Sequence, residues 1–136
     1  MGKRRLARET VLQALYLTDT TTMGPGEAFV IAGGEALDEE TARFTRELLD
    51  GAAADREALD REIQATAENW AVARMASVDR SLLRLAAFEL LHCPATPISV
   101  IIDEAVEIAK KYSSEDSSKF INGILGKLKD RRPATP

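Results

Sequence analysis

The sequence predicts an all-α fold. Apolar residues recur at spacings of three and four positions along most of the 136 residues, which is the pattern of amphipathic helices. Glycine and proline interrupt this pattern early, in Gly-Pro-Gly at 24–26 and Gly-Gly at 33–34, and so mark breaks between helices. The length suits one domain, and a hydrophobic content of 45% is typical of a globular protein.

Three helices are predicted before position 52. Residues 4–18 place their apolar side chains on one face, and residues 27–32 are long enough for one or two helical turns. Asp38 is a predicted N-cap, because its carboxylate can accept a hydrogen bond from the backbone of the following turn. Gly51 is expected to end or bend the helix that begins there.

The next two helices are predicted over residues 59–70 and from Ser77 onward, with Ser77 as a cap. The first of them carries Trp70 on its apolar face. The second is apolar on so many sides that we expect it to be central and buried. Glu89 lies inside this apolar stretch, and a buried carboxylate needs a partner. The arginines close to it in the sequence are Arg80 and Arg84.

The last two helices are predicted over 97–112 and 116–130. The segment PISVII at 97–102 is rich in β-branched residues, as strands are. Its apolar spacing continues well past the length of a strand, and Thr96-Pro97 is a typical helix start, so we predict a helix. Asn122-Gly123 is a typical hairpin pair, yet it is flanked by apolar residues at helical spacing and is also predicted to be helical.

Charge is distributed unevenly along the chain, whose net charge is −4. Residues 1–22 and 119–136 are basic, while residues 23–70 carry twelve acidic and four basic side chains. Two basic ends around an acidic middle suit a polyanion on one surface and a basic partner on another. The alternative is that most of these charges are only solvated.

Several classes of function find no support in the sequence. There is no nucleotide-binding glycine motif, and His92 is the only histidine, which leaves no histidine cluster for a metal. Cys93 follows His92, but neighbours on a helix point about 100° apart, which does not suit a nucleophile pair. No apolar run reaches the roughly 20 residues that span a bilayer, and no secretory apolar segment follows the basic start. We therefore expect a cytoplasmic binding protein with no catalytic site, cofactor or metal.

A basic cluster lies where the first predicted helix begins. Its members are Lys3, Arg4, Arg5 and Arg8. A guanidinium group donates two parallel hydrogen bonds to a phosphate, and basic arms gain affinity for nucleic acid by releasing counterions. These residues are candidates for nucleic-acid binding, and a solvated helix start is the alternative.

Phe120 lies at the edge of the apolar face of the last predicted helix, next to a polar and mostly basic stripe with Asp116 and Lys119. An aromatic ring at such an edge can stack on an unpaired base while lysines hold the backbone. Alternatively, the ring only closes the core. Gly123 costs about 1 kcal/mol relative to Ala inside a helix, which implies either a close helix approach or a gap beside Phe120.

Several long stretches resemble the NusB family of bacterial transcription factors. They are ARETVLQALY at 7–16, VDRSLLRLAAFEL at 78–90, PISVIIDEAVEIAKKYSSEDSSKFINGIL at 97–125, and the pair Trp70 and Arg74. The resemblance spans the chain and implies about seven helices in two small subdomains, at residues 1–69 and 70–132. It also implies transcription antitermination without catalysis. In this role the protein binds boxA single-stranded RNA of ribosomal RNA operons with NusE, a small-subunit ribosomal protein, in an RNA polymerase antitermination complex.

The resemblance also places roles on individual residues. The family's RNA-contacting surface falls on Lys3, Arg4, Arg5, Arg8, Asp116, Lys119 and Phe120, and its NusE contact falls on Tyr16 and Asp79. Asp103 and Gly126 depart from the family pattern, and Gly126 is expected to shorten or loosen the last helix. Two alternatives stay open: a NusB-like domain of an RNA cytosine methyltransferase, and a homodimer or larger homo-oligomer that acts in ribosome assembly.

Overall fold

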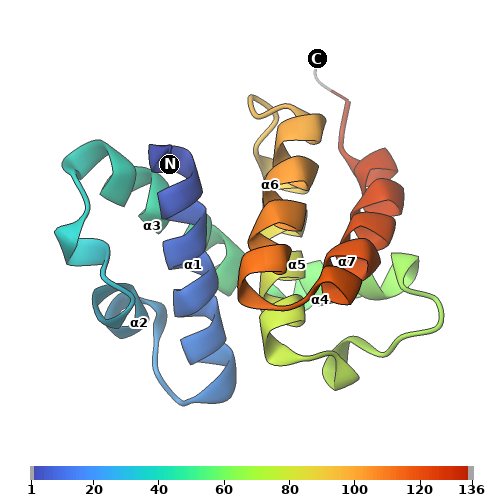
Figure 1. Ribbon diagram of the computed structural model, residues 1–136, viewed down its shortest axis with the longest axis horizontal. Coiled ribbons are helices and arrows are strands. Elements are labelled where there is room, and N and C mark those ends of the chain that lie inside the picture. Colours follow the sequence, from blue (N-terminus) through green and yellow to red (C-terminus); the bar gives the residue numbers. More distant parts are fainter. Residues whose placement is uncertain (1, 135–136) are drawn as a thin grey trace.

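The computed structural model describes residues 2–134, and this part of the chain is helical (Figure 1). Its α-helices are α1 (Lys3–Thr20), α2 (Pro25–Ile31), α3 (Glu39–Ala54), α4 (Arg56–Thr66), α5 (Ser77–His92), α6 (Ile98–Tyr112) and α7 (Glu115–Leu128). Three short 3₁₀ turns lie between or after them: η1 (Gly34–Ala36), η2 (Val72–Arg74) and η3 (Lys129–Arg131). Residues 2–134 contain no strand, so the predicted all-α fold and its seven helices are confirmed.

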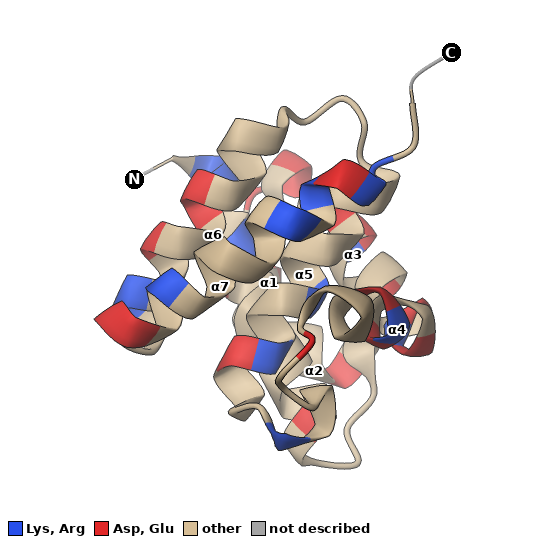
Figure 2. Ribbon diagram, turned by 90° about the vertical axis from the view of Figure 1, so that its right-hand side faces the viewer, with Lys and Arg blue, Asp and Glu red and all other residues tan. Residues whose placement is uncertain are grey.

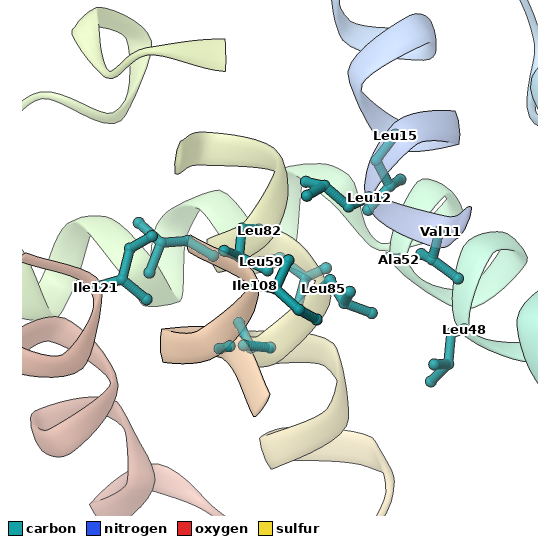
Figure 3. Packing of buried hydrophobic residues seen from close by; sticks show 14 of the residues in the cluster. Val11, Leu12, Leu15, Leu48, Ala52, Leu59, Leu82, Leu85, Ile108 and Ile121 are labelled. Carbon is teal, nitrogen blue, oxygen red and sulfur yellow. The ribbon is translucent and has the colours of Figure 1, made fainter. Parts of the chain in front are cut away.

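Helix α5 is central, as its apolar sequence predicts. Figure 1 shows α1, α2 and α3 on one side of the molecule and α5, α6 and α7 on the other. Because α5 packs against α1, α3, α4, α6 and α7, it joins the two sides. Figure 3 shows Leu82 and Leu85 of α5 among buried side chains from α1, α4, α6 and α7. One apolar cluster therefore continues across the predicted subdomain boundary near residue 70.

The start of α3 is the predicted one. The Oδ1 atom of Asp38 accepts a hydrogen bond from the backbone N–H of Thr41 at 2.8 Å. This bond, and a second one from the Lys3 ammonium, lower the pKa of Asp38 to about 2. The expected end of the helix at Gly51 is wrong, because α3 continues to Ala54. A Cβ at Gly51 would collide with the ring of Phe88, so this glycine allows α3 to pack closely on α5.

The segment between α4 and α5 differs from the prediction. Helix α4 ends at Thr66, and Trp70 lies beyond it with 60% of its surface exposed, so its predicted place on an apolar helix face is wrong. The Gln64 side chain holds this segment, because it donates to the Trp70 carbonyl at 2.8 Å and accepts from the Val72 N–H at 2.9 Å. Ser77 is the first residue of α5 and not its cap.

The helices predicted in the last third of the chain are confirmed, with small shifts at their ends. PISVII enters a helix that begins at Ile98, one residue after Pro97. Helix α7 begins at Glu115, where the Ser114 hydroxyl accepts from the backbone N–H of Ser117 at 3.0 Å. Asn122-Gly123 lies inside α7. The helix also continues through Gly126 to Leu128 and then tightens into η3.

The partner of buried Glu89 is Arg8, from the opposite end of the chain. The Arg8 guanidinium donates to both carboxylate oxygens of Glu89 at 2.9–3.1 Å, and the two residues are 4% and 1% exposed. Arg80 and Arg84, the two arginines near Glu89 in sequence, donate to Asp19 of α1 at 2.6 and 2.9 Å. Ion pairs thus join α1 to both ends of α5: Arg8 with Glu89 at one end, and Asp19 with Arg80 and Arg84 at the other.

Candidate nucleic-acid interface

The four basic residues at the start of α1 differ in their exposure to solvent and in the groups that they contact. Lys3 is exposed and lies 3.1 Å from the Asp38 carboxylate. The Arg4 guanidinium lies 3.7 Å from the centre of the Phe44 ring, which it covers. Arg5 is half-buried and donates to Glu104 at 2.8 Å, while Arg8 is buried against Glu89. A phosphate could therefore reach Arg4 without displacing a carboxylate, and it could reach Lys3 because the Lys3–Asp38 pair is exposed. It would compete with a more buried carboxylate for Arg5 and Arg8.

A broad groove of about 810 Å³ opens beside these arginines. It lies between the start of α1 and the start of α6, with Phe44 of α3, Val100 of α6 and Glu104 of α6 in its walls. Charges of both signs line it, since Arg4, Arg5 and Arg8 face Glu47 and Glu104. The groove presents a cation on an aromatic ring next to an apolar wall.

A second candidate surface forms around Phe120 in α7. The half-buried Phe120 ring meets the exposed Trp70 ring edge to face, with 5.4 Å between ring centres and an interplanar angle of 76°. Hollows open on both sides of this pair. One of about 290 Å³ is lined by Lys119, Gly123 and Lys127, and Figure 2 shows basic residues along α7. Two rings and two lysines thus lie together, as a stacked base with its phosphates requires.

The other hollow, of about 370 Å³, will be called the Asp79 hollow; it lies between Trp70, Arg74, Asp79, Asp116, Ser117 and Phe120. The Ser113 hydroxyl donates to Ser117, which donates to Oδ2 of Asp79 at 2.9 Å. Asp79 is 9% exposed, and its other oxygen, Oδ1, is buried and accepts no hydrogen bond from residues 2–134. Predicted RNA residues and a predicted protein-contact residue therefore share one hollow.

The structure does not bring the two candidate surfaces together. Helices α1 and α5 run in opposite directions, since Arg8 meets Glu89 near one end of α5 and Asp19 meets Arg80 near the other. Asp79, which binds Ser117 of α7, lies ten residues before Glu89 on α5. At 1.5 Å per residue, the two surfaces are about 15 Å apart along this helix. A ligand that uses both must be extended.

Tyr16, the other predicted protein-contact residue, lies on a different surface. Its ring is 40% exposed and borders a shallow groove of about 290 Å³, which will be called the Tyr16 groove. The groove lies between Leu12, Tyr16, Leu17, Ile31, Val78 and Tyr112. Ile31 is 58% exposed, so α2 extends the apolar surface. Val78 lines this groove while its neighbour Asp79 lines the Asp79 hollow, so α5 separates the two.

Sequence reasoning missed Trp70 as a site residue. Its apolar spacing from Leu59 and Ile63 suggested a continued helix, whereas Glu68 and Asn69 just before it interrupt the apolar pattern. That interruption is the signal that could have placed Trp70 in a loop. Aromatic residues at helical spacing are usually part of a helical core, so the spacing alone predicts the opposite.

No other part of the described chain offers reactive chemistry. Burial raises the pKa of the Cys93 thiol, and the His92 ring lies 3.3 Å from Asp55. Within residues 2–134, no group of three or more His, Cys, Asp and Glu side chains is arranged to hold a metal ion. None of the helices in this range has the length and apolar character needed to cross a membrane.

Comparison with known proteins gives consistent matches over nearly the whole chain. The model of the NusB family matches residues 5–130. The transcription antitermination protein NusB of Elusimicrobium minutum is 47% identical over 135 residues, which cover 97% of this chain and 96% of the relative. The same protein of Geotalea daltonii is 43% identical, with 98% of each chain covered.

Solved structures agree with these sequence matches. NusB of T. maritima superposes with a TM-score of 0.89 at 34% identity, covering 96% of this chain and 93% of that one. A chain in a structure of the antitermination factors NusB and NusE in complex with dsRNA superposes with a TM-score of 0.87 at 27% identity. In that match, 95% of this chain and 97% of the other are covered.

Proposed function

Since the chain belongs to the NusB family, we propose that it is a transcription antitermination protein that binds boxA-type single-stranded RNA together with NusE. On this proposal it acts in the bacterial cytoplasm on nascent transcripts of ribosomal RNA operons, within an RNA polymerase antitermination complex. The family is not enzymatic, and we assign the chain no catalytic role, cofactor or metal. The observation that carries the RNA part is the Phe120–Trp70 ring pair beside Lys119.

The RNA surface is proposed to have two parts. Unpaired bases stack on Phe120 and Trp70, because an exposed aromatic face accepts any base. Phosphates of the same strand meet Lys3 and Arg4 at the other end of α5, about 15 Å away along that helix. Paired RNA offers no free base face, so the ring pair favours a single strand. Arg5 and Arg8 are proposed to shape this surface, since Glu104 and Glu89 already hold their guanidinium groups.

NusE is proposed to bind at the Tyr16 groove. The groove is apolar, and Tyr16 and Ile31 leave large parts of their surfaces exposed. Glu27 of α2 and Glu35 of η1 are exposed on the same part of the chain, and their charge suits a basic ribosomal protein. Contact with RNA polymerase is proposed to follow from the assembled complex.

Binding measurements with a boxA-type RNA test the proposal. Fluorescence anisotropy of the labelled RNA is followed against the chain, NusE, and both together, at several salt concentrations. We expect the tightest binding with both proteins and a steep loss of affinity with salt. In Lys3→Gln, the slope of log affinity against log salt should fall by about one, as expected for one lost phosphate contact. Lys110→Gln on α6 is the matched control and should keep the slope. Absence of RNA binding in every combination would contradict the proposal.

The alternatives have their own tests. For the methyltransferase alternative, a methylation assay with this chain alone is the test, and turnover in that assay would support it. A homodimer would be detected by light scattering of the chain alone. Dissociation of such a dimer on addition of RNA and NusE would mark it as a storage form of the same protein.

A further inference from the structure

The connection between α4 and α5 presents an exposed tryptophan between two buried residues. Trp70 has 60% of its surface exposed, whereas Ala67 and Val72 on either side of it are 3% and 6% exposed. Together with Phe120, Trp70 forms an aromatic patch, and exposed apolar patches often mark a binding surface. The buried residues anchor the connection, and the tryptophan between them is left to a partner.

The side chain of Gln64 ties this connection to the last turn of α4. Its amide nitrogen donates to the carbonyl oxygens of Trp70 at 2.8 Å and of Ala67 at 3.3 Å. Its amide oxygen accepts from the backbone N–H of Val72 at 2.9 Å. An amide side chain carries both donors and an acceptor, so one glutamine holds three points of a backbone that has left the helix.

Arg80 of α5 holds the other half of the connection. Its Nη1 atom lies 3.1–3.2 Å from three carbonyl oxygens of residues 72–75, and its Nη2 atom donates to Asp19 at 2.6 Å. Residues 72–75 are thus fixed by a side chain that is itself fixed by α1. The half that carries Trp70 depends instead on Gln64.

We propose that Gln64 is a positioning residue of the RNA surface, which fixes the Trp70 ring beside Phe120 before RNA binds. This inference rests on the proposed RNA-binding function and adds a residue that acts through Trp70. The two rings meet edge to face with 5.4 Å between their centres, which leaves a face of each ring uncovered by the other. A base stacks more tightly on such a face when folding, and not binding, has already immobilised the ring.

The single tryptophan of the chain provides a direct readout, because a chain labelled with 5-fluorotryptophan gives one fluorine resonance. In Gln64→Met, which has no N–H donor, the resonance of the free protein should move towards its position in the urea-unfolded chain. With saturating unlabelled NusE, the affinity for a boxA-type RNA, measured by fluorescence anisotropy, should fall roughly three- to tenfold, the range for ordering one side chain.

Two further variants show that the reach of the amide matters. Gln64→Asn keeps the amide but is one methylene shorter, so it should resemble Gln64→Met in both measurements. Glu57→Met places the same residue at an exposed position of α4 and should change neither the resonance nor the RNA affinity. Because Gln64 is itself exposed, far-UV circular dichroism should show that each variant keeps its helices.

A Trp70→Ala background separates positioning from a direct role of Gln64. If Gln64 acts through the ring, Gln64→Met should cause little further loss of RNA affinity in this background. An equal loss with and without the ring would show that Gln64 contacts RNA or supports the fold in general, and would contradict the inference. An unchanged resonance or an unchanged RNA affinity in Gln64→Met would overturn it while leaving the proposed function intact. Failure of the wild-type chain to bind RNA with NusE would overturn the proposed function and this inference with it.

Discussion

Arg8 and Glu89 form a buried ion pair between residues 81 positions apart, with the Arg8 guanidinium donating to both carboxylate oxygens at 2.9–3.1 Å. The pair connects the first turns of α1 to the last turns of α5. It also satisfies an acidic residue inside α5, the helix that packs against both sides of the molecule. One member of the basic cluster at the N-terminus, Arg8, is consequently buried in the core, whereas Lys3, Arg4 and Arg5 reach the surface.

We expect Arg8→Met to act on stability. Removing one partner leaves Glu89 buried without a counter-charge, which should lower the free energy of unfolding by about 3–5 kcal/mol in urea titrations. The double variant Arg8→Met/Glu89→Leu removes both charges and should recover much of this loss. The salt slope of RNA binding should stay the same in the folded variants. A slope reduced by about one, with unchanged stability, would show that Arg8 contacts a phosphate instead.

Phe120→Ala is expected to weaken RNA binding by about 1–3 kcal/mol, because a base that stacks on the ring loses its contact. Trp70→Ala should weaken binding as well, and the double variant should show that the two rings are coupled. Phe120→Leu is the matched control for packing, since it keeps an apolar side chain against the core without an aromatic face. If Phe120→Leu restores full RNA affinity, the ring only closes the core.

Glycine substitutions in α7 distinguish the two explanations for Gly123. A Cβ at Gly123 or at Gly126 would meet no atom within 4 Å, so close helix approach does not explain either residue. Gly123→Ala and Gly126→Ala should each raise the free energy of unfolding by about 0.5–1 kcal/mol. Gly123→Met would fill the hollow beside Phe120 and should weaken RNA binding, whereas Gly126→Met should not. Equal RNA affinity in both Met variants would exclude a functional gap at Gly123.

Asp38 predicts a pH dependence. Its pKa in the folded protein is about 2, below the value of about 3.9 in an unfolded chain, because Thr41 and Lys3 donate hydrogen bonds to the ionised carboxylate. The ionised cap therefore stabilises the protein above pH 4, and this contribution is lost as the pH falls from about 4 to about 2. Asp38→Asn should show a shallower decline of the unfolding free energy over this range than the wild type. Asp103→Asn is the control, and an identical decline in both variants would contradict the assignment.

Tyr16→Ala should reduce the affinity for NusE, measured by calorimetry without RNA, because the ring borders the Tyr16 groove and is 40% exposed. Val100→Ala on α6 removes a similarly exposed apolar side chain from another surface and should have no effect. Loss of NusE binding in Val100→Ala alone would move the proposed contact to the groove beside Arg4.

Periodicity predicted the helices because each buries an apolar stripe, and it identified the helical state of Asn122-Gly123. The residue type of Asp38 predicted the one cap that the structure confirms, whereas Ser77 is not a cap. Periodicity did not predict the two helix ends that follow. Gly51 continues a helix because Phe88 packs against it, which local sequence does not reveal. Trp70 continued the apolar spacing, yet the chain left the helix at Thr66.

The candidate site shows the same division. Residue type and helical position indicated Phe120, Lys119 and Asp116 as neighbours, and they do lie together on α7. Which charges are free depends on partners distant in sequence, such as Glu89 for Arg8 and Glu104 for Arg5. The hydrogen bond from Ser117 of α7 to Asp79 of α5 likewise joins residues that are 38 positions apart. No spacing rule within one helix predicts such contacts.

The central position of α5 has a consequence for synthesis of the protein. A chain that has left the ribosome only as far as residue 70 holds Arg8 without Glu89 and Asp19 without Arg80 or Arg84. Its apolar helix faces also lack the wall that α5 supplies. We therefore expect the first half to complete its core only once α5 has emerged from the ribosome.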